Sequence, residues 1–443
     1  MDQRVDTLAA PILTDPIDRL LNGEYRDPDS GELVGVATRA LAITASLDGT
    51  EAELVGQLGF GRRLAVVSDP ATHAVFGERV EGALRGRFAV DSIVLSADPI
   101  PDMSTTAALR RETASADALI AVGSGTINDL CKYASFLDGK PYAVFATAPS
   151  MNGYTSITAA ITEGGHKKSL AAQAPRGAFF DLAVLSKAPS RLIRAGLGDS
   201  LCRTTAEADW LLAHLLFDKP FRRLPFALLA DDEPILFAHS ADLMAGSHEV
   251  MESLVRTLVL SGFGTAIVGS SEPASQGEHL VSHYIDMFAD GARRPIFHGE
   301  QVGVTTLSAA RLQHAMLENS PVVRPDTRTE ADFRARYGDE LGASCWADYR
   351  RKALSRRGAD ALNARLAESW DDIRTRIAGV LLPHEQLQEV LAAAGSPLTP
   401  EAIDLQRPFY ETALFEARDI RNRYTFLDLA ADSGRLPGLV ATL

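Results

Sequence analysis

Short, continuous apolar runs separated by spacers of helical length dominate the first half of the chain, and they constrain its fold more than any other feature. Runs of this kind are typical of strands covered on both faces, and helical spacers between them predict parallel crossovers. The strands predicted between about residues 36 and 185 are 63–67, 92–95, 118–122, 142–146 and 179–185. This pattern indicates a doubly wound α/β domain.

After Lys187 the sequence changes to long amphipathic stretches rich in Ala, Leu, Arg and Glu, which are typical of helices. A chain of 443 residues also exceeds what one hydrophobic core usually organises. We therefore predict an α/β N-terminal dinucleotide-binding domain with a parallel, Rossmann-like sheet at residues 1–186, and an all-α domain at residues 187–443. The strongly charged residues 324–383 predict a helical hairpin with a wide solvated face, where we expect no chemistry.

The charge balance and the cysteines exclude several classes of protein. A net charge of −14 disfavours nucleic acid and membrane surfaces as partners, and an anionic substrate would need a local cluster of cations. Cys131, Cys202 and Cys345 are too few and too widely spaced for a disulfide framework or a thiolate metal site. The N-terminus is acidic, and no run of about 18 apolar residues occurs, so we expect a cytoplasmic protein.

A glycine-containing turn, Gly123-Ser124-Gly125-Thr126, follows the strand predicted at 118–122 and leads into a helix. Glycine lets the backbone approach a pyrophosphate, and the free N–H groups at a helix N-terminus favour an anion. The turn does not match G-x-G-x-x-G. An equally good interpretation is a tight turn in which Thr126 is the helix N-cap and Asp129 completes a capping box.

Two further turns at strand ends are candidates for cofactor contact. Thr147 and Ser150 follow the strand predicted at 142–146, at the edge of the sheet where ligands bind in open α/β folds. Asp69 follows the strand at 63–67, where a carboxylate can bind ribose hydroxyls and repel a 2′-phosphate. Asp69 could equally be a helix N-cap before Pro70.

Three histidines form the sharpest chemical pattern. His279 and His283 are four residues apart and share one face of a helix, and His298 follows soon after. Clustered imidazoles suit a borderline divalent ion, and a catalytic site would add a carboxylate and leave one position open. Asp199 is the candidate carboxylate, although spacing alone does not single it out.

Six segments between about residues 118 and 429 resemble the iron-containing alcohol dehydrogenase superfamily, which has the dehydroquinate synthase-like fold. Within it they are most similar to the sn-glycerol-1-phosphate dehydrogenase branch. The segments occur in the expected order and spacing: GSGTINDLCKYASF, ATAPSMNGYTS, DLAVLSKAPSRLIRAGLGDSLCRTTAEADW, HLVSHYIDM, HGEQVGVTTL and RDIRNRYTFLDL.

The resemblance implies roles for the candidate residues. The metal ligands would be Asp199, His279 and His298, with His283 near the nicotinamide and the reacting carbon. Asp129 would lie at the mouth of the substrate site, and the cofactor would be held by Gly123, Ser124, Gly125, Thr126, Thr147 and Ser150. Arg203 stands where iron-type relatives often have a fourth ligand, a histidine. Three protein ligands make Zn²⁺ and Ni²⁺ as acceptable as Fe²⁺.

The implied activity is metal-dependent, NAD- or NADP-linked interconversion of dihydroxyacetone phosphate and sn-glycerol 1-phosphate by a homodimer. The alternatives are a dehydroquinate synthase-like lyase, a dehydrogenase for glycerol or another polyol, and a non-catalytic protein on the same fold. A substrate phosphate needs cations, for which Arg203, Lys167 and Lys168 are the candidates. We expect Arg421 and Arg423 to be structural and to pair with acidic side chains.

Overall fold

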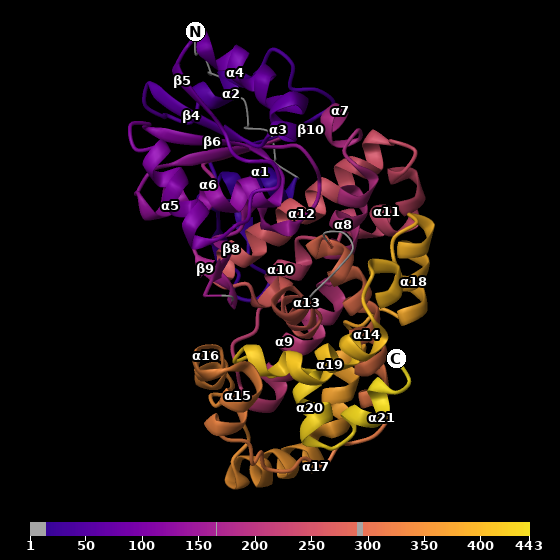
Figure 1. Ribbon diagram of the computed structural model, residues 1–443. Coiled ribbons are helices and arrows are strands. Elements are labelled where there is room, and N and C mark those ends of the chain that lie inside the picture. The colour runs from indigo at the N-terminus through magenta and orange to yellow at the C-terminus, as the bar shows by residue number, and fades with distance from the viewer. Residues whose placement is uncertain (1–14, 165, 290–295) are drawn as a thin grey trace, which may run out of the picture.

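The computed structural model describes residues 15–164, 166–289 and 296–443, with a sheet at one end and helices at the other (Figure 1). All neighbouring strands of the main sheet are parallel, and the sheet has 6 strands in the order β3-β10-β7-β6-β4-β5. Their bounds are β3 (Ala40–Thr44), β10 (Gly177–Asp181), β7 (Tyr142–Ala146), β6 (Ala118–Gly123), β4 (Arg63–Ser68) and β5 (Ala89–Val94). The predicted α/β fold with a parallel sheet is confirmed.

The strands read as continuous apolar runs because both faces of the sheet are buried. Val66 and Ile120 pack on one side with residues of α2 (Glu51–Gly56) and α4 (Glu78–Arg85). The alternating residues, Val67 and Leu119 among them, belong to a second core that continues into α6 (Gly125–Leu137), α8 (Ser190–Leu201) and α12 (His248–Val268). This second core crosses the boundary placed between residues 186 and 187, so the sheet and the first helices after it pack as one unit.

One predicted strand was too long, and β3 and one hairpin were not predicted. The strand predicted at 179–185 ends at Asp181, because the Asp181 carboxylate accepts the Val184 N–H (3.1 Å) and caps α7 (Leu182–Leu185). The antiparallel hairpin of β8 (Thr158–Glu163) and β9 (His166–Ala171) was not predicted at all. About half of its residues are polar, unlike the buried strands of the main sheet.

The described residues beyond Asp181 form helices and no strand, as predicted. The helices that carry the site are α8, α9 (Arg203–Phe217), α13 (Gly277–Phe288) and α14 (His298–Leu317). The remaining elements include β1 (Tyr25–Arg26), β2 (Leu33–Val34), α1 (Pro16–Leu21), α3 (Pro70–Thr72), α5 (Met103–Glu112), α10 (Leu224–Ala227), α11 (Asp232–Ala238), α18 (His384–Ala393), α19 (Arg407–Glu416), α20 (Phe426–Asp432) and α21 (Leu436–Val440).

Helix α12 is apolar enough, and with 21 residues long enough, to cross a membrane, and no other described helix is. However, 72% of its most apolar window is buried inside the protein. Leu254 and Leu258 on this helix belong to the same core as the sheet. We therefore interpret α12 as the central core helix of the fold.

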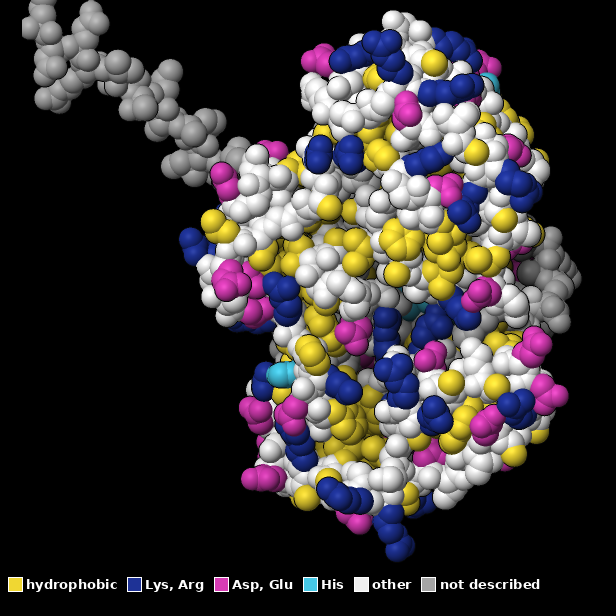
Figure 2. Space-filling view, turned by 90° about the vertical axis from the view of Figure 1, so that its left-hand side faces the viewer, with side chains coloured by type: hydrophobic (Ala, Val, Ile, Leu, Met, Phe, Trp, Pro, Cys, Tyr) yellow, Lys and Arg dark blue, Asp and Glu magenta, His cyan; other side chains and the backbone are white. Residues whose placement is uncertain are grey.

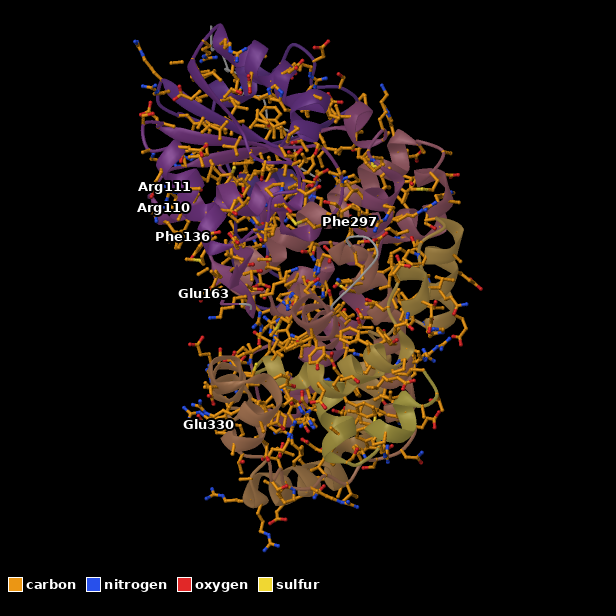
Figure 3. The ribbon with its side chains drawn as sticks, viewed as in Figure 1. Arg110, Arg111, Phe136, Glu163, Phe297 and Glu330 are labelled. Carbon is orange, nitrogen blue, oxygen red and sulfur yellow. The ribbon has the colours of Figure 1, made fainter. Side chains whose placement is uncertain are left out.

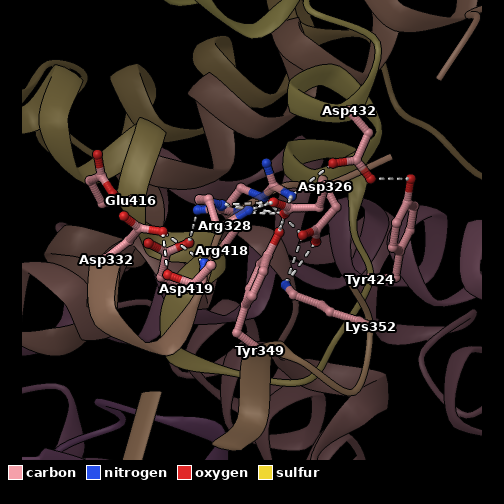
Figure 4. A network of polar contacts seen from close by, with 12 residues as sticks. Asp326, Arg328, Asp332, Tyr349, Lys352, Glu416, Arg418, Asp419, Tyr424 and Asp432 are labelled. Carbon is pink, nitrogen blue, oxygen red and sulfur yellow. Dashed lines mark hydrogen bonds and ion pairs between the residues drawn. The ribbon is translucent and has the colours of Figure 1, made fainter. Parts of the chain in front are cut away.

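The charged segment 324–383 is not the predicted hairpin, since it contains α15 (Glu330–Tyr337), α16 (Asp339–Tyr349) and α17 (Arg356–Ala378). Part of its charge is also buried, since the side chain of Lys352 is 4% exposed, and Figure 4 shows the polar network to which Lys352 belongs. Arg328 binds Asp419 (2.6 Å), and Lys352 binds Asp428 (2.9 Å), so this segment is tied to the C-terminal helices by ion pairs. Buried charges of this kind persist because each has an opposite partner.

Candidate active site

Glycines bring α8 and α14 close enough for Asp199 and His298 to meet. A Cβ at Gly198 would lie 2.2 Å from the Gly299 carbonyl oxygen, and one at Gly299 would lie 1.9 Å from the Ala195 carbonyl oxygen. Any side chain at these positions would push the helix backbones apart. Asp199 therefore projects from α8 at the point where α14 begins.

Replacing Gly198 by Ala should destabilise the protein by about 1 to 3 kcal/mol, the usual cost of overpacking, and should weaken metal binding by separating α8 from α14. Thermal unfolding and a metal titration would measure both effects. Gly82→Ala is the matched control, because a Cβ there meets nothing within 4 Å and should be neutral or slightly stabilising. A fully stable Gly198→Ala protein with unchanged metal affinity would contradict this packing argument.

The start of α14 is fixed by contacts that place His298 as its first residue. The Glu300 carboxylate accepts the Phe297 N–H (3.0 Å) and binds Arg191 (2.6 Å), whose guanidinium lies over the Phe297 ring (4.6 Å to the centroid). Figure 3 labels Phe297 in the middle of the molecule, between the sheet end and the helical end. His298 is therefore held at the junction of the two parts.

The structure brings together Asp199, His279 and His298. One ligand atom from each lies within 4.8 Å of the other two, and Asp199 Oδ1 is 3.4 Å from His279 Nε2. Asp199 and His279 are buried. His283, on the same face of α13, stacks on His298 with ring centroids 5.9 Å apart.

The residues present fit a divalent metal ion. Asp199 Oδ1 is buried without a hydrogen-bond partner among the described residues, whereas Oδ2 accepts the Asn152 N–H (2.7 Å). His279 Nδ1 is 2.9 Å from the Glu278 carboxylate, an arrangement that leaves Nε2 free as a ligand. One carboxylate and two imidazoles are a common protein contribution to a catalytic zinc site with an open position.

A cavity of about 240 Å³ adjoins these ligands at the carboxyl edge of the sheet. The predicted site residues that line it are Ser124, Gly125, Thr126, Asp129, Ser150, Lys167, Asp199, His279, His283 and His298. Predicted residues outside its lining are Asp69, Gly123, Thr147, Arg203 and Lys168. The cavity therefore joins the glycine turn, the three ligands and one of the candidate cations.

The glycine turn presents free N–H groups to the cavity. Ser124 is the N-cap of α6 and makes no side-chain capping bond, so the alternative in which Thr126 caps the helix and Asp129 completes a capping box is not found. Asp129 instead accepts the Ala160 N–H (3.0 Å) and the Asn128 side-chain amide (3.1 Å). The first N–H groups of α6 remain available to an anion.

Asp69 makes the contacts of a helix N-cap, which is the alternative role that the sequence allowed. Its carboxylate accepts the Thr72 N–H (2.8 Å) and its own N–H donates to Thr72 Oγ1 (3.0 Å), which together cap α3. It still lies at the carboxyl end of β4, directly beside β6 and its glycine turn in the sheet. A contact with the cofactor therefore stays a prediction.

His283 faces the cavity as a neutral imidazole. Burial lowers its pKa well below the usual value, and the nearby charges of Arg421 and Lys167 lower it further. Its Nδ1 is buried and has no hydrogen-bond partner among the described residues. The ring can therefore accept a hydrogen bond from a molecule in the cavity.

Two of the three candidate phosphate ligands lie outside the cavity lining and are paired with carboxylates. Arg203 begins α9 after α8 has ended at Leu201, so it does not continue the face of Asp199. Its guanidinium binds Glu207 and Glu233, both at 2.8 Å.

Lys168 points to the other side of β9 from Lys167 and binds Glu163 (2.8 Å), which Figure 3 labels at the hairpin. Lys167 alone of the three lines the cavity, where it forms an ion pair with Asp286.

Arg421 and Arg423 both bind segments that line the cavity. Arg423 donates to Ser271 Oγ (2.8 Å) and to the Ser275 carbonyl oxygen, and Arg421 donates to the Lys167 carbonyl oxygen (3.0 Å). Among the described residues Arg423 forms no ion pair with an acidic side chain, contrary to expectation, whereas acidic pairing of Arg421 stays a prediction. Both arginines hold the walls of the cavity.

Sequence reasoning missed two buried charged residues of the site. Lys132 is fully buried behind Asp129, where it donates to Ser156 Oγ (3.0 Å) and to the Thr158 carbonyl oxygen (3.1 Å), and burial lowers its pKa to about 8. The sequence signal for Lys132 was its place three residues after Asp129 as the one basic residue of α6. Glu278 was signalled only by its position directly before a candidate ligand.

Comparison with known proteins shows which class of protein shares this fold. The model of the family described as iron-containing alcohol dehydrogenase matches residues 42–189. The crystal structure of glycerol dehydrogenase from Schizosaccharomyces pombe shares the fold, with a TM-score of 0.60 and 15% identity over 91% of this chain and 90% of that one.

Curated relatives define the particular family. Glycerol-1-phosphate dehydrogenase [NAD(P)+] from Geobacillus stearothermophilus is 30% identical over 386 residues, which cover 85% of this chain and 89% of the relative. The protein of the same name from Pyrococcus furiosus is 34% identical over 58% of this chain and 73% of its own length. The chain belongs to the glycerol-1-phosphate dehydrogenase family.

Proposed function

We propose that this protein interconverts dihydroxyacetone phosphate and sn-glycerol 1-phosphate by hydride transfer at C2, with NAD or NADP and one divalent ion. The observation that carries the proposal is that one cavity is lined by the helix N-terminus of α6, the Asp199, His279 and His298 cluster, and Lys167. An anionic cofactor, a metal ion and an anionic substrate group each have a matching partner there. The names of the curated relatives support the same activity.

The residues of the cavity would divide the work as follows. Asp199, His279 and His298 would hold the ion, which supplies Lewis-acid polarisation of the C2 oxygen while the nicotinamide exchanges the hydride. The N–H groups of Gly125 and Thr126 would bind the cofactor diphosphate. Lys167 Nζ would hold the substrate phosphate, and His283 Nδ1 would accept the hydroxyl proton during oxidation, directly or through water.

The surface charge supports an anionic substrate despite the net charge of −14. Figure 2 shows a hollow between the sheet end and the helical end, with Lys and Arg side chains gathered around it. Among the described residues that line the cavity, Lys167 is the one Lys or Arg. A single lysine suits one phosphate better than the several anionic groups of a dehydroquinate synthase substrate, and it would have no partner in free glycerol.

Oxidation of NADH by the metal-reconstituted protein tests the substrate class. Dihydroxyacetone phosphate should oxidise NADH fastest, and free dihydroxyacetone should do so far more slowly. A phosphorylated keto acid should cause no net loss of NADH. Equal rates with the phosphorylated and free ketones would favour a polyol dehydrogenase. Turnover of the keto acid without net NADH loss would favour the lyase.

The choice between the two cofactors is tested at Asp69. Asn caps a helix as well as Asp does, so Asp69→Asn should keep α3 intact while removing the charge that would repel a 2′-phosphate. We expect the ratio of kcat/KM for NAD to that for NADP to fall by about tenfold, which corresponds to 1.4 kcal/mol. A parent protein that uses both cofactors equally, or a variant with an unchanged ratio, would remove Asp69 from the cofactor site.

We also propose a cytoplasmic homodimer and leave the ion as zinc, nickel or iron. Light scattering in solution would give the oligomeric state. Metal analysis of protein purified without added metal would identify the ion. Neither result affects the assignment of the ligands.

A further inference from the structure

A continuous line of hydrogen bonds joins the cavity lysine to one of the candidate metal ligands. Lys167 Nζ donates to Asp286 Oδ2, and Gln301 Nε2 donates to Asp286 Oδ1 (2.8 Å). Ser282 Oγ donates to Gln301 Oε1 (2.6 Å) and lies 3.2 Å from His298 Nδ1. We name this set, Lys167, Asp286, Gln301, Ser282 and His298, the Lys167–His298 bridge.

The bridge draws on three separate elements of the fold. Lys167 comes from the β8–β9 hairpin, Ser282 and Asp286 from α13, and Gln301 and His298 from the first turn of α14. Ser282 and Gln301 are buried, with exposed fractions of 0% and 2%. Their polar groups therefore depend on one another rather than on water.

The chemistry of the groups sets the direction of every hydrogen bond. A carboxylate paired with lysine only accepts, so Gln301 must turn its amide N–H to Asp286 and its carbonyl oxygen to Ser282. The single hydroxyl proton of Ser282 is then given to Gln301. His298 Nδ1 must consequently be the donor to Ser282, and the lone pair of the ring is left on Nε2.

We propose that the Lys167–His298 bridge positions His298 as a metal ligand, by holding it as the Nδ1–H tautomer with Nε2 directed at Asp199 and His279. Ser282, Gln301 and Asp286 are positioning residues, because they act through His298 and not on the substrate. This inference rests on the proposed function only for the role of His298 as a ligand. His279 has a simpler support, since Glu278 binds its Nδ1 directly.

Zinc affinity tests the bridge without any need for turnover. Ser282→Ala and Gln301→Met should each weaken Zn²⁺ binding about 10- to 100-fold in competition with a chromogenic chelator, the usual effect of removing a partner of a ligating histidine. Binding of NADH, followed by fluorescence, should change less than about twofold. Ser253→Ala is the matched control, because it removes a buried serine hydroxyl of α12 that bonds to the Glu249 carbonyl oxygen (3.3 Å).

Zinc affinity within twofold of the parent protein for both variants would overturn the proposal. If Ser282→Ala and Gln301→Met fail to fold, zinc binding by the Asp286→Asn variant tests the bridge instead. The Asp286 side chain is 19% exposed, and a loss of zinc affinity of about three- to tenfold supports the bridge while no loss overturns it. A parent protein that binds zinc but does not reduce dihydroxyacetone phosphate would refute the proposed function and leave the bridge intact. A parent that binds no zinc, nickel or iron would overturn the bridge.

Discussion

Replacing Asp199 by Ala should abolish metal binding and lower kcat/KM for dihydroxyacetone phosphate by about three powers of ten, or some 4 kcal/mol. The reason is that Asp199 supplies the one anionic ligand of the proposed set, through an oxygen with no hydrogen-bond partner in the part of the chain that the structure describes. Metal content of the purified variant and steady-state kinetics measure the two effects. Ser200→Ala, which removes the neighbouring hydroxyl bonded to the Leu197 carbonyl oxygen (2.8 Å), should leave both unchanged.

Chelation extends the same test to the parent protein. Removing the ion should abolish NADH oxidation, and adding zinc, nickel or iron should restore it. NADH should still bind to the depleted protein, because the glycine turn and the N-terminus of α6 are separate from the ligands. Full activity in metal-free protein, or in the Asp199→Ala variant, would contradict the proposal that activity depends on a metal ion held by Asp199.

Replacing Lys167 by Met should lower kcat/KM for dihydroxyacetone phosphate about 10- to 100-fold, the 1.5 to 3 kcal/mol of a hydrogen bond to a charged group. Activity on free dihydroxyacetone should fall much less, because that ketone lacks the phosphate and is affected only through the Lys167–His298 bridge. Lys168→Met is the matched control, since it removes a lysine from the opposite side of the same strand. Steady-state kinetics on both ketones with both variants provide the measurement.

The outcomes of the lysine experiment separate two explanations. Equal losses on the phosphorylated and free ketones with Lys167→Met would mean that the lysine holds the walls of the cavity through Asp286 rather than the phosphate. No loss on either would place phosphate recognition elsewhere. An equally large loss with Lys168→Met would show that the effect comes from a disturbance of β9 and not from the loss of the Lys167 side chain.

Much of the fold could be predicted from the sequence because its sheet is buried on both faces. Val66 and Ile120 pack on one side, and Val67 and Leu119 on the other, so the strands appear as unbroken apolar runs. The end of the last strand could not be predicted, because it depends on Asp181 capping α7. The β8–β9 hairpin was missed because it projects from the main sheet and its pattern is half polar.

Only the part of the site that depends on local spacing in the sequence could be predicted. His279 and His283 follow from one turn of helix, whereas Asp199 meets them through the glycine contacts of α8 and α14, far apart in sequence. Arg203 misled the prediction because the end of α8 at Leu201 cannot be read from the spacing. Asp286 and Gln301 were missed because their contacts, of Asp286 with Lys167 and of Gln301 with α13, join different elements of the fold.

The most direct test of the central claim is the product formed from dihydroxyacetone phosphate and NADH by the metal-reconstituted protein. The proposed function predicts one sn-glycerol 1-phosphate for each NADH oxidised, as determined by chiral analysis of the product. Formation of sn-glycerol 3-phosphate, or no oxidation of NADH by protein that contains its metal, would contradict it.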